Sequence, residues 1–195
     1  MDQDPQPQLI LASSSPRRQQ LLREAGITFT VEAAEIDETP LAGEDAQEHA
    51  LRLAREKAGA VARRFPRDLV LGADTIVVVD GEILGKPASQ QDAARMLRRL
   101  SGRSHQVFTA VCLVVPGKGA DTRSCTTQVH FRELKEGEIQ EYIDGGEPMD
   151  KAGAYAIQGG AAKWVTGIEG DYSNVVGLPQ MLAAEMLRAC GFLQS

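Results

Sequence analysis

The stretch that decides the fold reads LVLGADTIVVVDGEILGKP and runs from Leu69 to Pro87. Aliphatic and β-branched residues predict a buried strand on both sides of Asp74, a carboxylate where a core strand normally has an apolar residue. Asp80-Gly81 predicts a hairpin, because a two-residue type I′ turn needs positive φ at both central positions. With that loop, Thr75 faces Lys86, and Asp74 lies beside them. The hairpin therefore brings a carboxylate and an ammonium group together.

Two interpretations of this pair stay open at this point. Asp74 and Lys86 could form a structural ion pair at the end of a sheet, or they could belong to a site that binds a ligand. Glycines at positions 72 and 85 favour the second interpretation, because a strand glycine often marks a close approach of another group.

The composition is that of an ordinary globular chain. Its 195 residues are 43% hydrophobic and 25% charged, with a net charge of −6, which argues against nucleic-acid or membrane-surface binding. No apolar run approaches the roughly 20 residues of a membrane span, and the polar first residues do not resemble a secretory signal. Three scattered cysteines predict free thiols in the cytoplasm rather than a zinc site. We expect residues 1–8 to be a flexible N-terminal segment and residues 9–195 to form one domain.

The first motif, SSSPRR, begins at Ser13. It follows a short apolar strand at residues 9–12, and Pro16 suits the first position of a helix. A helix N-terminus with hydroxyl groups and two guanidinium groups suits an anion such as phosphate. The alternative is an ordinary helix cap with exposed arginines. However, Arg17 and Arg18 lie in the first turn, where cations oppose the helix dipole, so they need another reason to be there.

The next helix, predicted over residues 44–64, has a lysine in its apolar stripe. At about 100° per residue, Lys57 projects between Leu53 and Ala54. A lysine on a buried face needs a partner or a water-filled cleft, and the alternative is that it extends to the helix edge. Before this helix, the acids of residues 35–38 form either a solvated loop or, near a bound triphosphate, a cation site at Asp37 or Glu38.

The second half of the chain completes the fold prediction. We expect a helix after Ser89, strands at residues 105–115, 123–131, 151–158 and 164–168, a helix at 136–144 and a last helix after Pro179. His105 is expected on a half-solvated strand. Gln158, beside two glycines, is either a surface residue or an amide that contacts a nucleobase. This order predicts an α/β protein whose mixed, twisted sheet has flanking helices and whose two lobes enclose a central cleft.

Scattered cations around a carboxylate suit a triphosphate and a divalent cation. Phosphoryl and nucleotidyl transfer depend mainly on positioning and on neutralising charge. The sequence has no GxxxxGK[ST], so a P-loop enzyme is excluded, and no GxSxG. Hydrolysis by a water activated near Asp74 is therefore the simplest hypothesis.

The motifs together resemble the Maf family of nucleoside triphosphate pyrophosphatases. They occur in the family's order, from about Leu9 to the C-terminal helix: SSSPRR with QLLREAGI, the IDE acids, LAREKA, LGADTIVVVDG, GKP, and GAYAIQG with IEGDYSNVVGLP. No single motif is decisive, but their joint order and spacing are specific. One mild departure is the second serine of SSSPRR, where members of the family often have glycine or alanine.

This resemblance implies a reaction and roles for particular residues. A nucleoside triphosphate would be cleaved to the monophosphate and pyrophosphate, with Asp74 as the catalytic residue, either as proton acceptor for water or through a metal ion. Arg17, Thr75 and Gln158 match positions linked to substrate choice, and the IQG form resembles the branch that acts on dTTP and UTP. The other cleft positions match Ser13, Arg18, Glu38, Lys57 and Lys86.

The resemblance also implies a divalent cation, Mg²⁺ or Mn²⁺, with Glu38 and Asp74 as its ligands, a cytoplasmic location and a homodimer. Two alternatives stay open: a nucleotide-binding regulator of cell division that hardly hydrolyses, and the same chemistry on another base such as 7-methyl-GTP.

Overall fold

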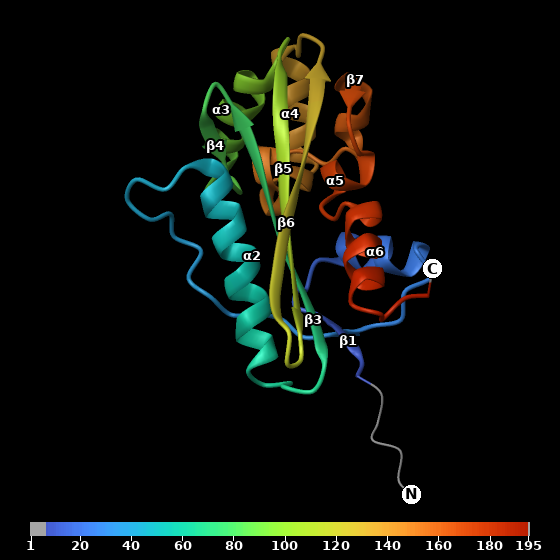
Figure 1. Cartoon of the computed structure of the whole chain (residues 1–195). Helices are drawn as coiled ribbons and strands as arrows, with labels where there is room; N and C mark the ends of the chain where they lie inside the picture. The colour runs from blue at the N-terminus through green and yellow to red at the C-terminus, as the bar shows by residue number, and fades with distance from the viewer. Residues whose placement is uncertain (1–6, 195) are drawn as a thin grey trace, which may run out of the picture.

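Seven strands form one mixed sheet in the computed structural model, which describes residues 7–194 (Figure 1). The strands are β1 (Leu9–Leu11), β2 (Thr30–Val31), β3 (Leu69–Val79), β4 (Glu82–Leu84), β5 (Ser104–Val115), β6 (Gly119–Phe131) and β7 (Val165–Glu169). Their order is β2-β1-β3-β5-β6-β7, and β4 pairs with β3. Strand β1 runs parallel to β2 and β3, whereas the other pairs are antiparallel. The mixed sheet predicted from the sequence is confirmed.

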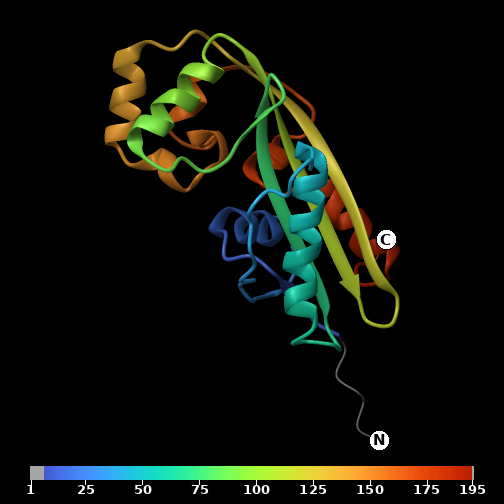
Figure 2. The same cartoon turned by 90° about the vertical axis from the view of Figure 1, so that its left-hand side faces the viewer.

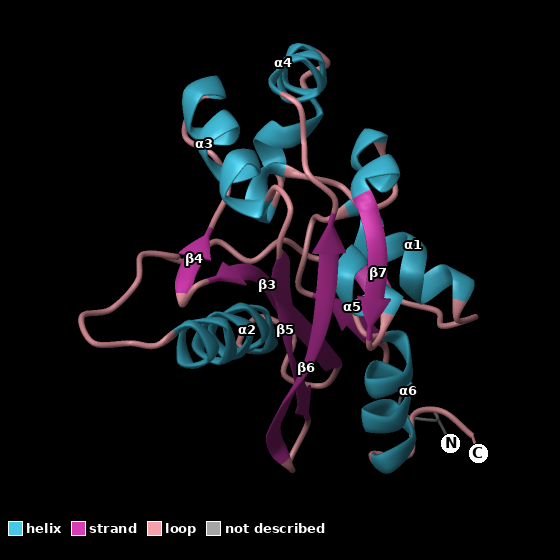
Figure 3. Ribbon diagram, turned by 90° about the horizontal axis from the view of Figure 1, so that it is seen from above, coloured by secondary structure: helices cyan, strands magenta, loops and turns pink. Residues whose placement is uncertain are grey.

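The helices divide between the sheet faces and a second lobe. They are α1 (Pro16–Glu24), α2 (Ala46–Ala62), α3 (Gln90–Leu100), α4 (Glu136–Asp144), α5 (Tyr172–Val176) and α6 (Gln180–Ala189), with 3-10 turns η1 (Glu147–Asp150), η2 (Ala152–Ala154) and η3 (Gly160–Trp164). Helix α2 covers one face of the sheet, and α1, α5 and α6 lie on the other side (Figure 3). Helices α3 and α4 form a separate lobe at one end of the long strands (Figure 2).

Two hydrophobic cores reflect this division. The smaller core lies under α2, whose small residues Ala50, Ala54 and Ala58 pack against β3 and β5. The larger core continues from the opposite face of the sheet into the second lobe and includes Trp164, which is fully buried.

Gly72 lets α2 lie directly on β3. A Cβ at this position would come within 2.6 Å of the Ala54 carbonyl oxygen and 2.7 Å of the Ala58 nitrogen. The prediction that this glycine leaves room for a ligand is therefore wrong, because α2 occupies the space. The contact matters for the site, since Lys57 precedes Ala58 on this part of the helix and is brought close to the strand.

Strand β3 changes partner along one edge. Leu69–Leu71 pair with β1, and Val77–Val79 pair with β4. Among the described residues, no strand pairs with residues 72–76 on this side. We call this gap the notch. It lies at the carboxyl end of β1, and Asp74 is in its middle.

Several local predictions are resolved by the structure. The Asp80-Gly81 turn has φ of 51° and 77°, and Val79 pairs with Glu82 as the two-residue loop requires. The strand predicted at residues 151–158 is wrong, because η2 and a turn occupy it. His105, expected to be half-solvated, is 2% exposed.

Other expectations meet the structure only in part. The three cysteines are free, as expected. Within the described part of the chain, no helix is long and apolar enough to cross a membrane. The segment predicted to be flexible, residues 1–8, lies outside the described residues except for its last two.

Candidate active site

A cavity of about 850 Å³ opens at the notch and is lined by residues of both lobes. Seven of the eight binding or catalytic residues predicted from the sequence line it: Ser13, Arg17, Arg18, Lys57, Asp74, Thr75 and Lys86. Glu38, predicted as a metal ligand, lines it too. The eighth, Gln158, is exposed on the second lobe and does not line the cavity.

The start of α1 supplies the first wall. Ser15 caps the helix by accepting a hydrogen bond from the Arg18 amide, and Pro16 opens the first turn. The Arg18 side chain donates to the Gly177 carbonyl (2.8 Å), to Ser13 Oγ (3.2 Å) and to Thr75 Oγ1 (3.1 Å). These bonds fix a guanidinium group at the edge of β3.

Burial lowers the pKa of Arg18, and the nearby charge of Asp74 opposes this effect. Asp74 and Thr75 are neighbours on β3, so their side chains point to opposite faces of the sheet. Both reach the cavity because the strand edge is open at the notch. Arg18 therefore approaches from the α1 side, and Asp74 faces α2.

On the α2 side, one ammonium group joins two carboxylates. Lys57 Nζ lies 2.7 Å from Asp74 Oδ1 and 2.8 Å from Glu38 Oε1. The side chains of Lys57 and Asp74 are 11% and 10% exposed, while that of Glu38 is 51% exposed. Burial raises the pKa of Glu38, but the contact with Lys57 and the charges of Lys86 and Arg18 outweigh it, so this pKa lies below its ordinary value.

These two carboxylates fit part of a divalent cation site. Among the described residues, no group of three or more His, Cys, Asp or Glu side chains could hold a metal by itself. Glu38 and Asp74 offer hard oxygen donors that converge on one point, which Lys57 Nζ holds here. Mg²⁺ commonly uses one or two carboxylates together with substrate phosphates, so the donor set fits a cation that arrives with a triphosphate. Asp37, the other acid considered, accepts hydrogen bonds from Thr39 instead.

The loop that carries Glu38 is clamped to α2. Arg52 donates to both carboxylate oxygens of Glu44, at 2.6 and 2.9 Å, and to the Thr39 carbonyl at 3.1 Å. Glu44 also accepts from the Leu41 amide. The hydrogen bond from Arg52 lowers the pKa of Glu44 to about 2. The clamp therefore stays ionised and fixes the loop immediately after Glu38.

Sequence reasoning missed the lining that comes from the second lobe. Asp150, Lys151, Ala152 and Tyr155 all line the cavity. The sequence predicts a strand at residues 151–158 and assigns none of these side chains to the site. Gly153 and Ala154 both adopt positive φ, which a strand does not contain, and no signal in the sequence alone indicates this.

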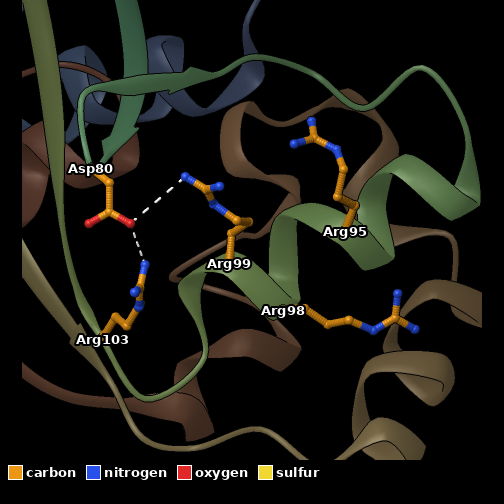
Figure 4. A pocket seen from close by; sticks show the side chains of 5 residues that line it. All are labelled: Asp80, Arg95, Arg98, Arg99 and Arg103. Carbon is orange, nitrogen blue, oxygen red and sulfur yellow. Dashed lines mark hydrogen bonds and ion pairs between the residues drawn. The ribbon is translucent and has the colours of Figure 1, made fainter.

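A second cavity, of about 570 Å³, lies away from the notch. Its lining is one carboxylate and four guanidinium groups: Asp80, Arg95, Arg98, Arg99 and Arg103 (Figure 4). Each arginine already has an acidic partner: Asp92 and Glu82 for Arg95, Glu136 for Arg98, Glu82 and Asp80 for Arg99, and Asp80 for Arg103. Because the charges balance, this cluster ties the tip of the β3–β4 hairpin to α3 and to the start of β5.

The chain is similar to known proteins over nearly its whole length. Residues 8–190 match the protein family described as Maf-like protein. A protein named dTTP/UTP pyrophosphatase from Koribacter versatilis (strain Ellin345) is 56% identical over 185 residues, which cover 95% of each chain. A protein of the same name from Myxococcus xanthus (strain DK1622) is 52% identical over 94% of this chain and 92% of its own.

One solved structure has a similar fold. A HAM1 protein from Coxiella burnetii aligns with a TM-score of 0.51 at 15% identity and covers 93% of this chain and 99% of its own. At this identity the likeness concerns the fold alone.

Proposed function

The chain belongs to the family of Maf-like proteins, and from that premise we propose that it hydrolyses dTTP and UTP to the nucleoside monophosphate and pyrophosphate. The names of relatives that are 52% to 56% identical over nearly the whole chain support this substrate choice. The observation that carries the proposal is the notch, where Asp74 lies between the fixed guanidinium group of Arg18 and the ammonium group of Lys57.

We assign different roles in hydrolysis to the residues of the notch. The N-terminus of α1, with Ser13 and Arg18, suits the phosphate groups, because its free amides and fixed donors are already oriented. Lys57 and Lys86 add positive charge where the leaving pyrophosphate gains negative charge. In this proposal, Asp74 accepts a proton from the water that attacks the α-phosphorus. Its Oδ1 is bonded to Lys57, which leaves Oδ2 for this task.

We further propose that a divalent cation, Mg²⁺ or Mn²⁺, is held by Glu38 and Asp74. The cation would neutralise phosphate charge and lower the pKa of bound water. Lys57 bridges both carboxylates, so its ammonium group would leave this position if a cation were held by Glu38 and Asp74. Lys57 thus keeps the two acids together before the substrate arrives.

A cytoplasmic location and a homodimer are proposals that rest on the family resemblance. Light scattering after size-exclusion chromatography tests the second, with a single species of about twice the chain mass as the expected result.

The function is tested by product analysis. Purified protein with Mg²⁺ or Mn²⁺ should release pyrophosphate, not phosphate, from dTTP and UTP. Asp74→Asn should lower kcat at least 100-fold, because a positioned general base contributes about 10²–10⁴-fold. Equal turnover by Asp74→Asn and the wild type would refute the role of Asp74. Tight UTP binding without turnover in the wild type would favour the regulator hypothesis.

A further inference from the structure

Part of the cavity lining is apolar. Val77 and Val107 pair across β3 and β5, and Val176 from α5 lines the cavity with them. On the second lobe, Tyr155 also lines the cavity, and its hydroxyl bonds to His105 Nε2 at 2.7 Å. We call these four side chains the apolar slot, because apolar lining next to a phosphate site suits the faces of a nucleobase.

The polar groups beside this slot come from the segment Asp150–Tyr155. Lys151 is only 14% exposed, and its ammonium group is held by the Glu147 carbonyl at 2.6 Å and by Asp150 Oδ1 at 2.5 Å. The Asp150 carboxylate is 73% exposed at the rim. The hydrogen bond from Lys151 lowers the pKa of Asp150 most, and the charge of Arg17 lowers it further.

The segment packs against Val77 of β3 and bonds to Gly85, which follows β4. Gly153 donates its amide to the Gly85 carbonyl at 3.1 Å, and a Cβ at Gly153 would lie 3.0 Å from the Val77 methyl groups. Ala154 is held at a φ of 59°, a conformation that costs energy in any residue with a Cβ. Such strain persists only where surrounding contacts impose it, and here it fixes the main chain of a cavity wall.

We infer that the nucleobase binds in this slot and that Lys151 and Asp150 read its edge. The inference rests on the proposed function. Uracil and thymine present a carbonyl oxygen beside an N–H group, and these complement the ammonium donor of Lys151 and the carboxylate acceptor of Asp150. Cytosine presents an amino group and a bare ring nitrogen at the same places, so both contacts become repulsive or unpaired. Gln158 does not line the cavity.

Calorimetry with uncleavable ligands tests the inference. We would titrate the wild type, Lys151→Met and Asp150→Asn with α,β-methylene UTP, α,β-methylene CTP and inorganic tripolyphosphate. Lys151→Met should weaken the binding of the UTP analogue about tenfold or more, which is the range of a hydrogen bond to a charged group. It should also lower the ratio of the affinities for the UTP and CTP analogues. Tripolyphosphate has no base, so its affinity for Lys151→Met should lie within about twofold of its affinity for the wild type.

Controls separate this contact from a general loss of charge or of fold. Lys163→Met removes an exposed lysine of the same lobe that does not line the cavity, so its affinities should equal those of the wild type. Lys151→Arg keeps a donor and should retain the preference for the UTP analogue. If Lys151→Met fails to fold, Lys151→Arg and Asp150→Asn still test the ratio.

Two results would overturn the inference. One is an equal loss of tripolyphosphate and UTP-analogue binding in Lys151→Met, which would make Lys151 a phosphate contact. The other is loss of the UTP/CTP ratio in Gln158→Ala but not in Lys151→Met. The outcome is independent of catalysis: if the wild type releases no pyrophosphate, the proposed function fails, while the calorimetric ratios still decide the base contact.

Discussion

Lys57 Nζ lies 2.7 Å from Asp74 Oδ1, and both side chains are about nine-tenths buried. Neither group could be left alone at this depth without a large desolvation cost. The pair therefore explains how a core strand carries a carboxylate and how an apolar helix face carries a lysine.

Lys57→Met should reduce both stability and activity. Removing one partner of a buried ion pair typically costs about 3–5 kcal/mol of stability. Because Asp74 borders a cavity, we expect a loss of about 3 kcal/mol, at the lower end of this range. Urea unfolding measures this loss, and kcat should fall at the same time. The double variant Lys57→Met/Asp74→Asn should recover part of the stability but none of the activity. A double variant that loses the sum of the two single losses would show that the pair is not coupled.

Gly72→Ala should displace α2 from β3. The new Cβ meets backbone atoms of Ala54 and Ala58 at 2.6 and 2.7 Å, so relief requires a shift of the whole helix. We expect a loss of about 1–3 kcal/mol, as for other overpacked cores, together with a lower kcat because Lys57 moves with the helix.

Gly59→Ala is the matched control for Gly72→Ala. Gly59 lies in α2, where a Cβ meets no atom closer than the Arg63 Nη1 at 3.8 Å. Alanine in a helix is favoured over glycine by about 0.5–1 kcal/mol, so this variant should be slightly more stable. If both variants unfold at the same urea concentration as the wild type, the close packing described for Gly72 is wrong.

His105 should make the protein less stable as the pH falls from 7 to 5. Burial, aided by the charge of His130, lowers the pKa of His105 from 6.5 to about 4. The folded state therefore binds fewer protons than the unfolded state between these values, and the stability present above pH 6.5 is progressively lost. Linkage gives a loss of about 2 kcal/mol by pH 5 and about 3 kcal/mol below pH 4.

The variant His105→Phe isolates this effect, because other titrating groups stay. It loses the bond to the Tyr155 hydroxyl, so its stability at pH 7 should be lower, but its urea midpoint should vary less between pH 7 and 5. Parallel pH profiles of the two proteins would contradict a neutral, buried His105. The physical reason for the low pKa is visible in the structure: Nδ1 has no hydrogen-bond partner among the described residues, so a proton there would be buried without an acceptor.

Arg52→Met should weaken metal binding more than it slows the chemical step. Without the clamp on Glu44 and on the Thr39 carbonyl, the loop that carries Glu38 is no longer fixed. We expect a higher Mg²⁺ concentration for half-maximal activity and a higher KM, with a smaller change in kcat. Arg55→Met is the control, because Arg55 is exposed on the same helix and bonds to Thr122. The same Mg²⁺ requirement in both variants would argue against the clamp.

The hairpin and the helix faces could be predicted because their causes are local. Asp80-Gly81 sets its own turn, Pro16 begins its helix, and the stripe that contains Lys57 follows from helix periodicity. The gathering of these residues around Asp74 was predictable only from their chemistry and from the family resemblance, not from any one segment.

The second lobe could not be predicted as well, because its conformation is imposed from outside. The segment around Ala154 has positive φ only because Gly85, Val77 and His105 hold it. Small residues in an apolar run resemble a strand when these contacts are unknown. The burial of His105 has the same origin, since the covering aromatic residues Phe131 and Tyr155 are distant in sequence.

Strand β3 pairs with β1 before the notch and with β4 after it, so the number of residues between these two pairings is fixed. One extra residue between Leu71 and Val77 would turn every later side chain of the strand to the wrong face. Surface loops elsewhere can grow or shrink, but here an insertion would uncouple the parallel half of the sheet from the antiparallel half. Substitutions in this short interval should therefore be tolerated far better than insertions or deletions.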